Sequence, residues 1–251
     1  MIRERAPGKV ILLGEYAVLY GATALVAATD RFARVTLEPQ GSFELCALGH
    51  ELRVEHCDAL RAADSRLSLV ASVFEQVSGG LPKVRVTINT DEFFQGGTKL
   101  GLGSSAAVAV ALARALRRLG GESPSAQQLF QDAHAAHQHA QGGVGSGIDI
   151  AASAYGGLLA YRAPQPGSQT PSHAEPVRWP QALEWSVVFT GRSASTPSLV
   201  SAVEALRRER PAESQSLLES LASTSERGVT AFAGGSLESF HDAVSSFGEQ
   251  M

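Results

Sequence analysis

The first ninety residues carry short apolar runs and strict apolar–polar alternation, which are typical of β-strands. Arg31–Glu38 largely alternates, and Lys83–Ile88 alternates strictly. Gly49 separates two of the runs and predicts a hairpin between them. Five strands are predicted, at Lys9–Leu13, Ala24–Leu37, Ser42–Leu48, Glu51–Glu55 and Lys83–Ile88.

Apolar residues at helical spacing dominate the middle and the end of the chain. The clearest helix is Ser104–Leu119, which is rich in alanine and ends at Gly120-Gly121. Ser125 is predicted to cap the next helix, which runs to about Gln141. Arg66–Val77 and Asp149–Ala154 are also predicted to be helical. Three further helical stretches follow residue 190, the last at Leu237–Met251.

The second half shows few strands. Gly157–Tyr161 and Glu184–Phe189 are the two predicted there. Between them, Ala163–Pro180 is rich in Pro, Ser, Gln and Thr, which indicates a boundary or a surface excursion. We therefore expect one domain at 1–175 and a second at 176–251. Because the second has few strands and ends inside a helical pattern, we expect a truncated chain.

Composition narrows the classes of protein. The chain has 251 residues, 44% hydrophobic and 18% charged, which is ordinary globular composition. A net charge of −4 excludes a basic surface for nucleic acid or anionic membrane. Two cysteines without a CxxC pair, Cys46 and Cys57, argue against a disulfide framework and suit a reducing cytosol. With no signal-peptide pattern and no apolar run near ~20 residues, the chain is predicted to be soluble and cytoplasmic.

The glycine-rich segment Lys99–Ala107 (KLGLGSSAA) is the first candidate for chemistry. Its glycines let the backbone approach a ligand closely, and its serines begin the clearest helix, whose first N–H groups form an anion site. The string is not a P-loop, which needs GxxxxGK[ST]. It satisfies GxGxxA of dinucleotide sites, but that motif must follow a buried strand, and the preceding residues Gln95-Gly96-Gly97-Thr98 do not form one. A phosphate site and a plain helix start with permissive glycines both remain open.

Three segments together resemble the GHMP kinases, the family of galactokinase, homoserine kinase, mevalonate kinase and phosphomevalonate kinase. Ala6–Val18 (APGKVILLGEYAV) resembles the family's first motif, and Gly101–Ala107 (GLGSSAA) its second, with Gly97 where the family has proline. Gly143–Gly157 (GVGSGIDIAASAYGG) resembles the segment with the catalytic aspartate. The third motif, a glycine-rich loop near the C-terminus, is absent, which agrees with truncation and leaves the activity of this chain open.

Within the family, the resemblance favours the phosphomevalonate kinases and, next, the mevalonate kinases. Tyr16 after Gly-Glu, Lys99 before the second motif and Phe189–Thr196 are similar to the former. Gln138 stands where mevalonate kinases have a glutamate for Mg²⁺. The neighbourhood of Gly21-Ala22 is more similar to mevalonate kinases.

The resemblance implies an α+β fold: an N-terminal nucleotide-binding domain like domain 2 of ribosomal protein S5 at 1–175, and an incomplete ferredoxin-like C-terminal domain at 176–251. It implies ATP and Mg²⁺ as cofactors, a small-molecule acceptor (phosphomevalonate or mevalonate), and a monomer or homodimer. Asp149 would be catalytic, with Lys9 beside it to stabilise charge. The alternative for Asp149 is a helix N-cap.

The resemblance also assigns the remaining site residues. Ser105 would ligate Mg²⁺, and Arg192 would grip a phosphate already on the acceptor. ATP would be bound by Lys99, Leu100, Gly101, Leu102, Gly103, Ser104, Ser105, Ala106 and Ala107. The acceptor would be bound by Glu15, Tyr16, Ser146, Gly147, Arg192, Ser195 and Thr196.

Two function classes follow. The first is a kinase that transfers phosphate from ATP to phosphomevalonate or mevalonate; the second is a non-catalytic nucleotide- or metabolite-binding relative. The missing third motif favours the binding relative for this chain, whereas the pair Lys9 and Asp149 favours the kinase, because a binding module does not need both. His134, His137 and His139 form an H-x2-H-x-H string, but without a cysteine or acidic partner nearby it predicts no metal site.

Overall fold

The computed structural model describes residues 1–140, 142, 145–164, 171–191 and 196–251, which divide into two compact units. Unit 1 comprises Met1–Lys9 and Ala28–Gly156, and unit 2 comprises Val10–Ala27 and Gly157–Met251. The long strands β1 (Ile2–Leu13) and β2 (Thr23–Pro39) contribute to both units. The division at 175/176 stays a prediction about the family's domains.

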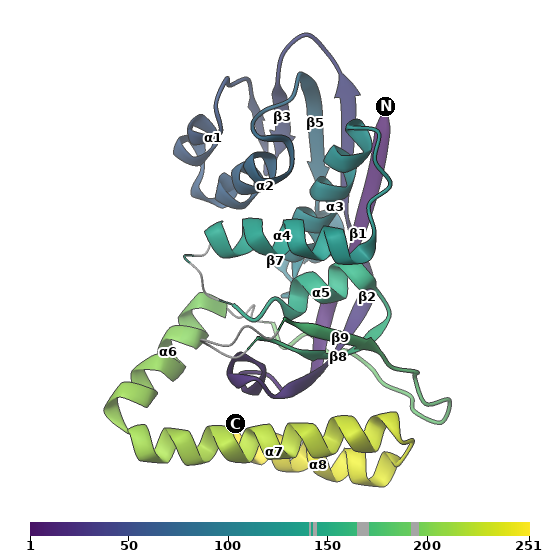
Figure 1. Cartoon of the computed structure of the whole chain (residues 1–251), viewed down its shortest axis with the longest axis vertical. Helices are drawn as coiled ribbons and strands as arrows, with labels where there is room; N and C mark the ends of the chain where they lie inside the picture. The colour runs from purple at the N-terminus through teal and green to yellow at the C-terminus, as the bar shows by residue number, and fades with distance from the viewer. Residues whose placement is uncertain (141, 143–144, 165–170, 192–195) are drawn as a thin grey trace. The chain divides into compact units, whose positions relative to one another are not determined.

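The sheet of unit 1 has the order β4-β3-β5-β2, and β1 also pairs with β2 (Figure 1). β5 (Val84–Asn89) runs antiparallel to β2, from Arg34 opposite Asn89 to Pro39 opposite Val84. The predicted hairpin is confirmed as β3 (Glu44–Ala47) and β4 (His50–Leu52). β3 is parallel to β5, while a separate two-stranded hairpin is formed by β6 (Phe94–Gln95) and β7 (Thr98–Lys99).

The helices of unit 1 pack on one another around α3 (Ser104–Leu119), which contacts α2, α4 and α5. Its alanines are buried because small side chains allow neighbouring helices to approach closely. α3 has the predicted bounds. The others are α1 (Cys57–Ala63), which was not predicted, α2 (Ser68–Ser78), α4 (Ala126–Ala140) and α5 (Ile148–Tyr155).

Single-turn 3₁₀ helices fall at Ala17–Tyr20 (η1), Ser65–Leu67 (η2) and Asp91–Phe93 (η3). The Ser125 hydroxyl accepts a hydrogen bond from the N–H of Gln128 at 3.1 Å, which confirms the predicted cap of α4. Arg117 makes two hydrogen bonds, of 2.8 and 2.9 Å, to the buried carboxylate of Asp132 on α4. This ion pair joins the C-terminal end of α3 to the middle of α4.

Unit 2 contains the beginning of β2, paired antiparallel with β8 (Leu158–Arg162) from Thr23 opposite Arg162 to Ala27 opposite Leu158. β8 in turn pairs with β9 (His173–Pro176), a strand the sequence did not predict. Three helices follow, as predicted: α6 (Thr196–Glu209), α7 (Pro211–Ala233) and α8 (Leu237–Gln250). α7 and α8 lie side by side (Figure 1).

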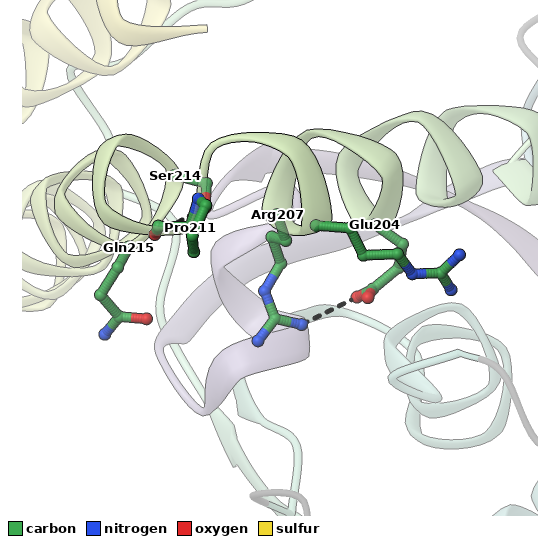
Figure 2. Close-up of a pocket in the computed structure, with 6 residues that line it drawn as sticks. Glu204, Arg207, Pro211, Ser214 and Gln215 are labelled. Atoms are coloured by element: carbon green, nitrogen blue, oxygen red, sulfur yellow. Dashed lines mark hydrogen bonds and ion pairs between the residues drawn. The ribbon is translucent and has the colours of Figure 1, made fainter.

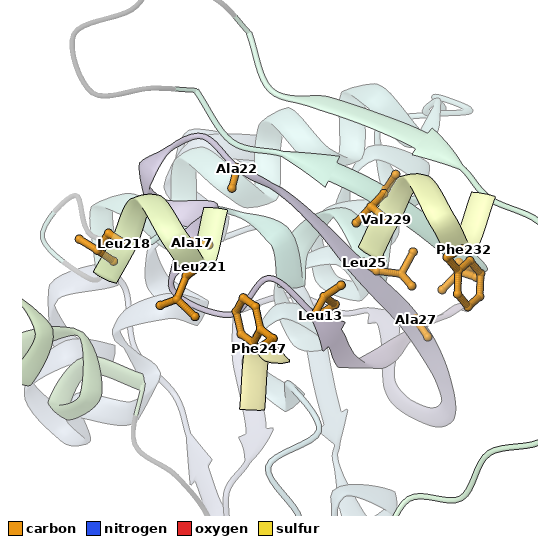
Figure 3. Packing of buried hydrophobic residues seen from close by; sticks show 12 residues of the cluster. Leu13, Ala17, Ala22, Leu25, Ala27, Leu218, Leu221, Val229, Phe232 and Phe247 are labelled. Carbon is orange, nitrogen blue, oxygen red and sulfur yellow. The ribbon is translucent and has the colours of Figure 1, made fainter. Parts of the chain in front are cut away.

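The core of unit 2 lies between its strands and α7 and α8 (Figure 3). Phe232 on α7 is 1% exposed, and its ring makes T-shaped contacts with Trp179 and Phe240 at 5.7 and 4.8 Å between centroids. The cluster consists of Leu13, Ala17, Ala22, Leu25, Ala27, Leu158, Ala160, Leu218, Leu221, Val229, Phe232 and Phe247.

The predicted strand at Glu184–Phe189 is wrong, because these residues have no regular secondary structure. Val187 and Val188 are 57% and 81% exposed. An apolar run becomes a strand only when another strand satisfies its backbone N–H and C=O groups, and no described strand pairs with this run. The mixed α and β architecture that was predicted is confirmed. No helix in the described part of the chain is long and apolar enough to cross a membrane.

Candidate active site

The glycine-rich loop connects the β6–β7 hairpin to the N-terminus of α3. The N–H of Leu100 donates to the carbonyl of Phe93 at 2.9 Å, which fixes the start of the loop. Gly103 is the N-cap of α3 and has φ 76°, a left-handed conformation that glycine adopts at no cost. Ser104 is buried and Ser105 half-buried in the first turn, whose N–H groups have no partner within the helix. The loop therefore presents backbone donors at the positive end of the helix dipole.

The loop is held against β1 beside Lys9. The N–H of Lys9 donates to the carbonyl of Leu102 at 2.8 Å. A Cβ atom on Gly103 would lie 2.9 Å from Cγ of Lys9, so the aliphatic part of the Lys9 side chain packs directly against Gly103. A Cβ on Gly8 would lie 2.3 Å from the carbonyl oxygen of Leu102, so this contact also requires glycine. The structure thus brings Lys9 and the loop together, although they are about ninety residues apart.

The same edge of β1 also holds α5, which carries Asp149. The hydroxyl of Ser153 on α5 donates to the carbonyl of Pro7 at 2.8 Å. Pro7 and Lys9 are two residues apart in a strand, so their backbone groups point to the same edge. Ser153 is one helical turn after Asp149 and shares its face. The face of α5 that bears Asp149 is therefore hydrogen-bonded to β1 at Pro7, two residues before Lys9.

Asp149 is the second residue of α5, and Gly147 is its N-cap. The alternative of Asp149 as the N-cap is therefore wrong, although a carboxylate in the first turn also stabilises a helix. Its Oδ1 accepts a hydrogen bond from the N–H of Ile150 at 2.9 Å. Its Oδ2 lies 3.9 Å from Nε2 of His137 on α4, and the side chain is 24% exposed. The Asp149 carboxylate is therefore partly accessible to solvent. Its Oδ1 contacts the backbone of Ile150, and its Oδ2 faces the ring of His137.

Of the residues expected to bind the acceptor, Ser146 and Gly147 lie directly before α5. The hydroxyl of Ser146 accepts from the N–H of Ile148 at 3.4 Å, and Gly147 is buried. Glu15 and Tyr16 belong to unit 2 and follow β1. Tyr16 has φ 61°, an uncommon conformation for a residue with a side chain, and burial followed by the charge of Glu15 raises the pKa of its phenol. Arg192 and Ser195 lie outside the described residues, and Thr196 begins α6.

A hollow of about 440 Å³ lies in unit 1 beside the hairpin that feeds the loop. Phe94 lines it and is 42% exposed, and its backbone pairs with that of Lys99. Asn89, Thr90 and Asp91 line it with polar groups at the end of β5. Asn89 and Asp91 hydrogen-bond each other, so the hollow offers mainly an aromatic surface beside the hairpin that precedes the glycine-rich loop.

A second hollow, of about 290 Å³, lies in unit 2 where α6 meets α7 (Figure 2). Arg207 donates from Nη1 to Oε1 of Glu204 at 3.0 Å, and Glu204 also accepts from the hydroxyl of Tyr20. Ser214 donates to the carbonyl of Pro211. Since these lining groups bind one another and none is an expected site residue, the hollow adds no catalytic group.

In the described part of the chain, the metal-ligand types gather at one place, Glu44, Cys46 and Glu51. Arg85 already contacts all three, with Nη1 at 2.8 Å from Oε1 of Glu44 and Nη2 at 3.4 Å from Sγ of Cys46 and from Oε1 of Glu51. Arg53 also binds Glu44, at 3.0 Å. The guanidinium groups occupy the donor atoms and supply the compensating charge, so this cluster is an ion-pair network rather than a metal centre.

The comparisons with known proteins identify the family. Residues 66–157 match the GHMP kinases N terminal domain. The phosphomevalonate kinase of Streptomyces sp. (strain CL190) is 30% identical over 93% of this chain and 73% of its own length. The chain belongs to the GHMP kinase family. The mevalonate kinase of Pyrococcus horikoshii is 32% identical over 86% of this chain. The chain spans 65% of the length of that archaeal enzyme.

The solved structures agree with this membership at the level of the fold. Streptococcus pneumoniae phosphomevalonate kinase, in complex with phosphomevalonate and AMPPNP, superposes with a TM-score of 0.80 at 21% identity, over 100% of this chain and 79% of that one. The predicted GHMP kinase fold is therefore confirmed.

Reasoning from the sequence missed two residues that lie next to these groups. His137 was considered as a metal ligand and rejected, and was not named as the neighbour of Asp149. Ser153, which binds β1, was not singled out. The spacing of Ser153 four residues after Asp149 on a predicted helix was a usable signal. No local signal links His137 to Asp149, because their approach depends on how α4 packs on α5.

Proposed function

We propose that this GHMP kinase transfers the γ-phosphoryl group of ATP to phosphomevalonate, giving diphosphomevalonate and ADP in the mevalonate pathway of isoprenoid biosynthesis. The observation that carries the proposal is that one edge of β1 binds two other segments. The backbone of Lys9 binds the glycine-rich loop at Leu102. The carbonyl of Pro7 binds the helix that carries Asp149. Phosphoryl transfer depends mainly on positioning and charge stabilisation, which such a rigid arrangement supplies.

The residues fit the cofactors. The free N–H groups of the first turn of α3 and the ammonium groups of Lys9 and Lys99 would bind the phosphates of ATP. The Ser105 hydroxyl, which has no hydrogen bond within the described part of the chain, would ligate Mg²⁺. The hollow beside Phe94 suits the base of the nucleotide. When bound, ATP supplies the phosphoryl group, and Mg²⁺ neutralises charge on its oxygens.

Asp149 would accept or orient the proton of the acceptor, and Lys9 would stabilise charge that develops in the transition state. Ser146, Gly147, Glu15, Tyr16, Ser195 and Thr196 would shape the acceptor site. An acceptor that already carries a phosphate is supported by Tyr16 and Lys99, which resemble phosphomevalonate kinases, and by Arg192, whose planar guanidinium suits a phosphate.

Mevalonate is the second candidate acceptor. It is favoured by the 32% identity to an archaeal mevalonate kinase and by the Gly21-Ala22 neighbourhood. A coupled assay of ADP release with mevalonate, phosphomevalonate, homoserine and galactose tests both candidates, with an acceptor-free reaction as the control. We expect the highest kcat/KM with phosphomevalonate. A higher value with mevalonate would establish the second candidate, and no release with any acceptor would leave a binding protein.

Replacing Gly8 by alanine is expected to weaken ATP binding about fivefold to a hundredfold. The new Cβ would lie 2.3 Å from the carbonyl oxygen of Leu102 and 2.6 Å from the ring of Phe93, so the loop has to move away from β1. Overpacking of this kind costs about 1–3 kcal/mol. Calorimetric titration with ATP measures the change.

Gly41 provides the matched control for this substitution. It is also a glycine of unit 1, and a Cβ there meets nothing within 4 Å. The Gly41→Ala protein should bind ATP as the unmodified protein does. Equal ATP affinity in the Gly8→Ala and Gly41→Ala proteins would show that the contact between Gly8 and Leu102 does not shape the nucleotide site.

A further inference from the structure

We propose that His137 is a positioning residue for Asp149, holding the carboxylate in the orientation that phosphoryl transfer requires. This inference rests on the proposed kinase function and extends it to a residue that lies outside the three sequence motifs. His137 lies on α4, which packs against α5, the helix of Asp149.

The first argument is burial. His137 is 6% exposed, and a buried imidazole is retained in proteins where its ring nitrogens have polar neighbours. Its Nε2 lies 3.9 Å from Oδ2 of Asp149, within the range of an ion pair and beyond that of a direct hydrogen bond. The ring therefore occupies the space toward which Oδ2 could turn and places a ring nitrogen there.

The second argument is the asymmetry of the carboxylate. Oδ1 is held by the N–H of Ile150 at 2.9 Å, whereas Oδ2 faces His137. Two different neighbours on the two oxygens restrict rotation about the bond to the carboxyl group. An acid or base must be aimed at the proton that it transfers, so this restriction serves the proposed reaction directly.

The neighbouring histidine supports positioning rather than metal binding. His134 precedes His137 by one turn, stacks on Phe130 at 5.2 Å, and has a buried Nε2 without a hydrogen-bond partner in the described residues. Burial lowers the pKa of His134, and the nearby charge of Asp149 acts in the opposite direction. His134, His137 and Asp149 are also not among the described groups whose ligand atoms are close enough to share an ion.

The test compares two substitutions at His137 with one at His139, an exposed histidine on the same helix. His137→Leu removes the polar ring, His137→Asn keeps a short donor, and His139→Leu is the control. We expect His137→Leu to lower kcat about 10- to 100-fold, as a small misplacement of a reacting group does. The KM for ATP should change less than about twofold, because the phosphate loop is untouched. His137→Asn should recover part of kcat, and His139→Leu should match the unmodified protein.

An unchanged kcat in the His137→Leu protein would overturn the inference. So would equal losses in both His137 variants accompanied by equal falls in thermal stability, because that pattern indicates a purely structural histidine.

A measurement without turnover separates the inference from the proposed function. In ¹H–¹³C NMR spectra, the imidazole signals of His137 should shift on Asp149→Asn, while those of His139 should not. If the His137 signals shift in a protein that transfers no phosphate, the contact between His137 and Asp149 is confirmed and the proposed function is wrong. If the His137 signals do not shift, the inference is wrong.

Discussion

The Asp149→Asn protein is expected to lose about 10²- to 10⁴-fold in kcat for ADP release with its acceptor, the usual contribution of a general acid or base. Asparagine has nearly the shape of aspartate, and its side-chain oxygen can still accept the hydrogen bond from the N–H of Ile150. The start of α5 is therefore preserved, while the negative charge is lost. Steady-state kinetics with saturating ATP measures the effect.

ATP affinity, measured by calorimetry, should stay within about twofold in the Asp149→Asn protein, because the glycine-rich loop leads into α3 whereas Asp149 lies on α5. Asp30→Asn is the control, since the Asp30 side chain is 94% exposed and belongs to the same unit. Retained turnover in the Asp149→Asn protein would remove Asp149 from the proposed mechanism. Loss of both ATP binding and turnover would indicate instead that the substitution disturbs the whole site.

The second large effect is expected on stability. Replacing Phe232 by alanine should lower the free energy of unfolding of unit 2 by about 3–5 kcal/mol, the usual cost of removing a buried phenylalanine ring. The Phe232 ring, labelled in Figure 3, is 1% exposed. It contacts the rings of Trp179 and Phe240, so its removal leaves a cavity beside these two aromatic side chains.

Both tryptophans of the chain, Trp179 and Trp185, lie in unit 2 with their rings 5.2 Å apart. Their fluorescence during urea unfolding therefore reports on the unit that contains Phe232. Phe94→Ala is the control, because Phe94 is 42% exposed and belongs to unit 1. A Phe232→Ala protein whose unfolding free energy changes by less than about 0.5 kcal/mol would show that this cluster does not stabilise the unit.

The two helices of unit 1 that carry the site differ in how well their ends could be predicted. For α3 the predicted and observed bounds agree, because its start and end are set by local chemistry: a left-handed Gly103 before Ser104 and Gly120 after Leu119. For α5 the sequence placed the helix correctly but left the role of Asp149 open between N-cap and active site. Its position after Gly147, the actual N-cap, excluded the first of these.

The arginines of α3 show where local reasoning fails. Arg114, Arg117 and Arg118 crowd the last turns of this helix, a pattern typical of a face exposed to solvent. Arg117 instead binds the buried Asp132, and Arg114 is half-buried and donates to the carbonyl of Arg5 at 2.7 Å. A charged side chain is buried only where a partner from another segment offsets the cost of losing water, and the sequence does not say which segment that is.

By itself, then, the sequence determined the family motifs, the helices that have their own caps, and the strands that alternate regularly, because these follow from interactions between residues close together in the chain. Only the tertiary structure decided that one edge of β1 holds both the glycine-rich loop and the helix of Asp149, and that His137 faces that carboxylate. It also decided that His173–Pro176 is a strand while the more apolar Glu184–Phe189 is not. The physical reason is the same in each case: a backbone group or a buried charge is stable only with a partner, and these partners come from distant parts of the chain.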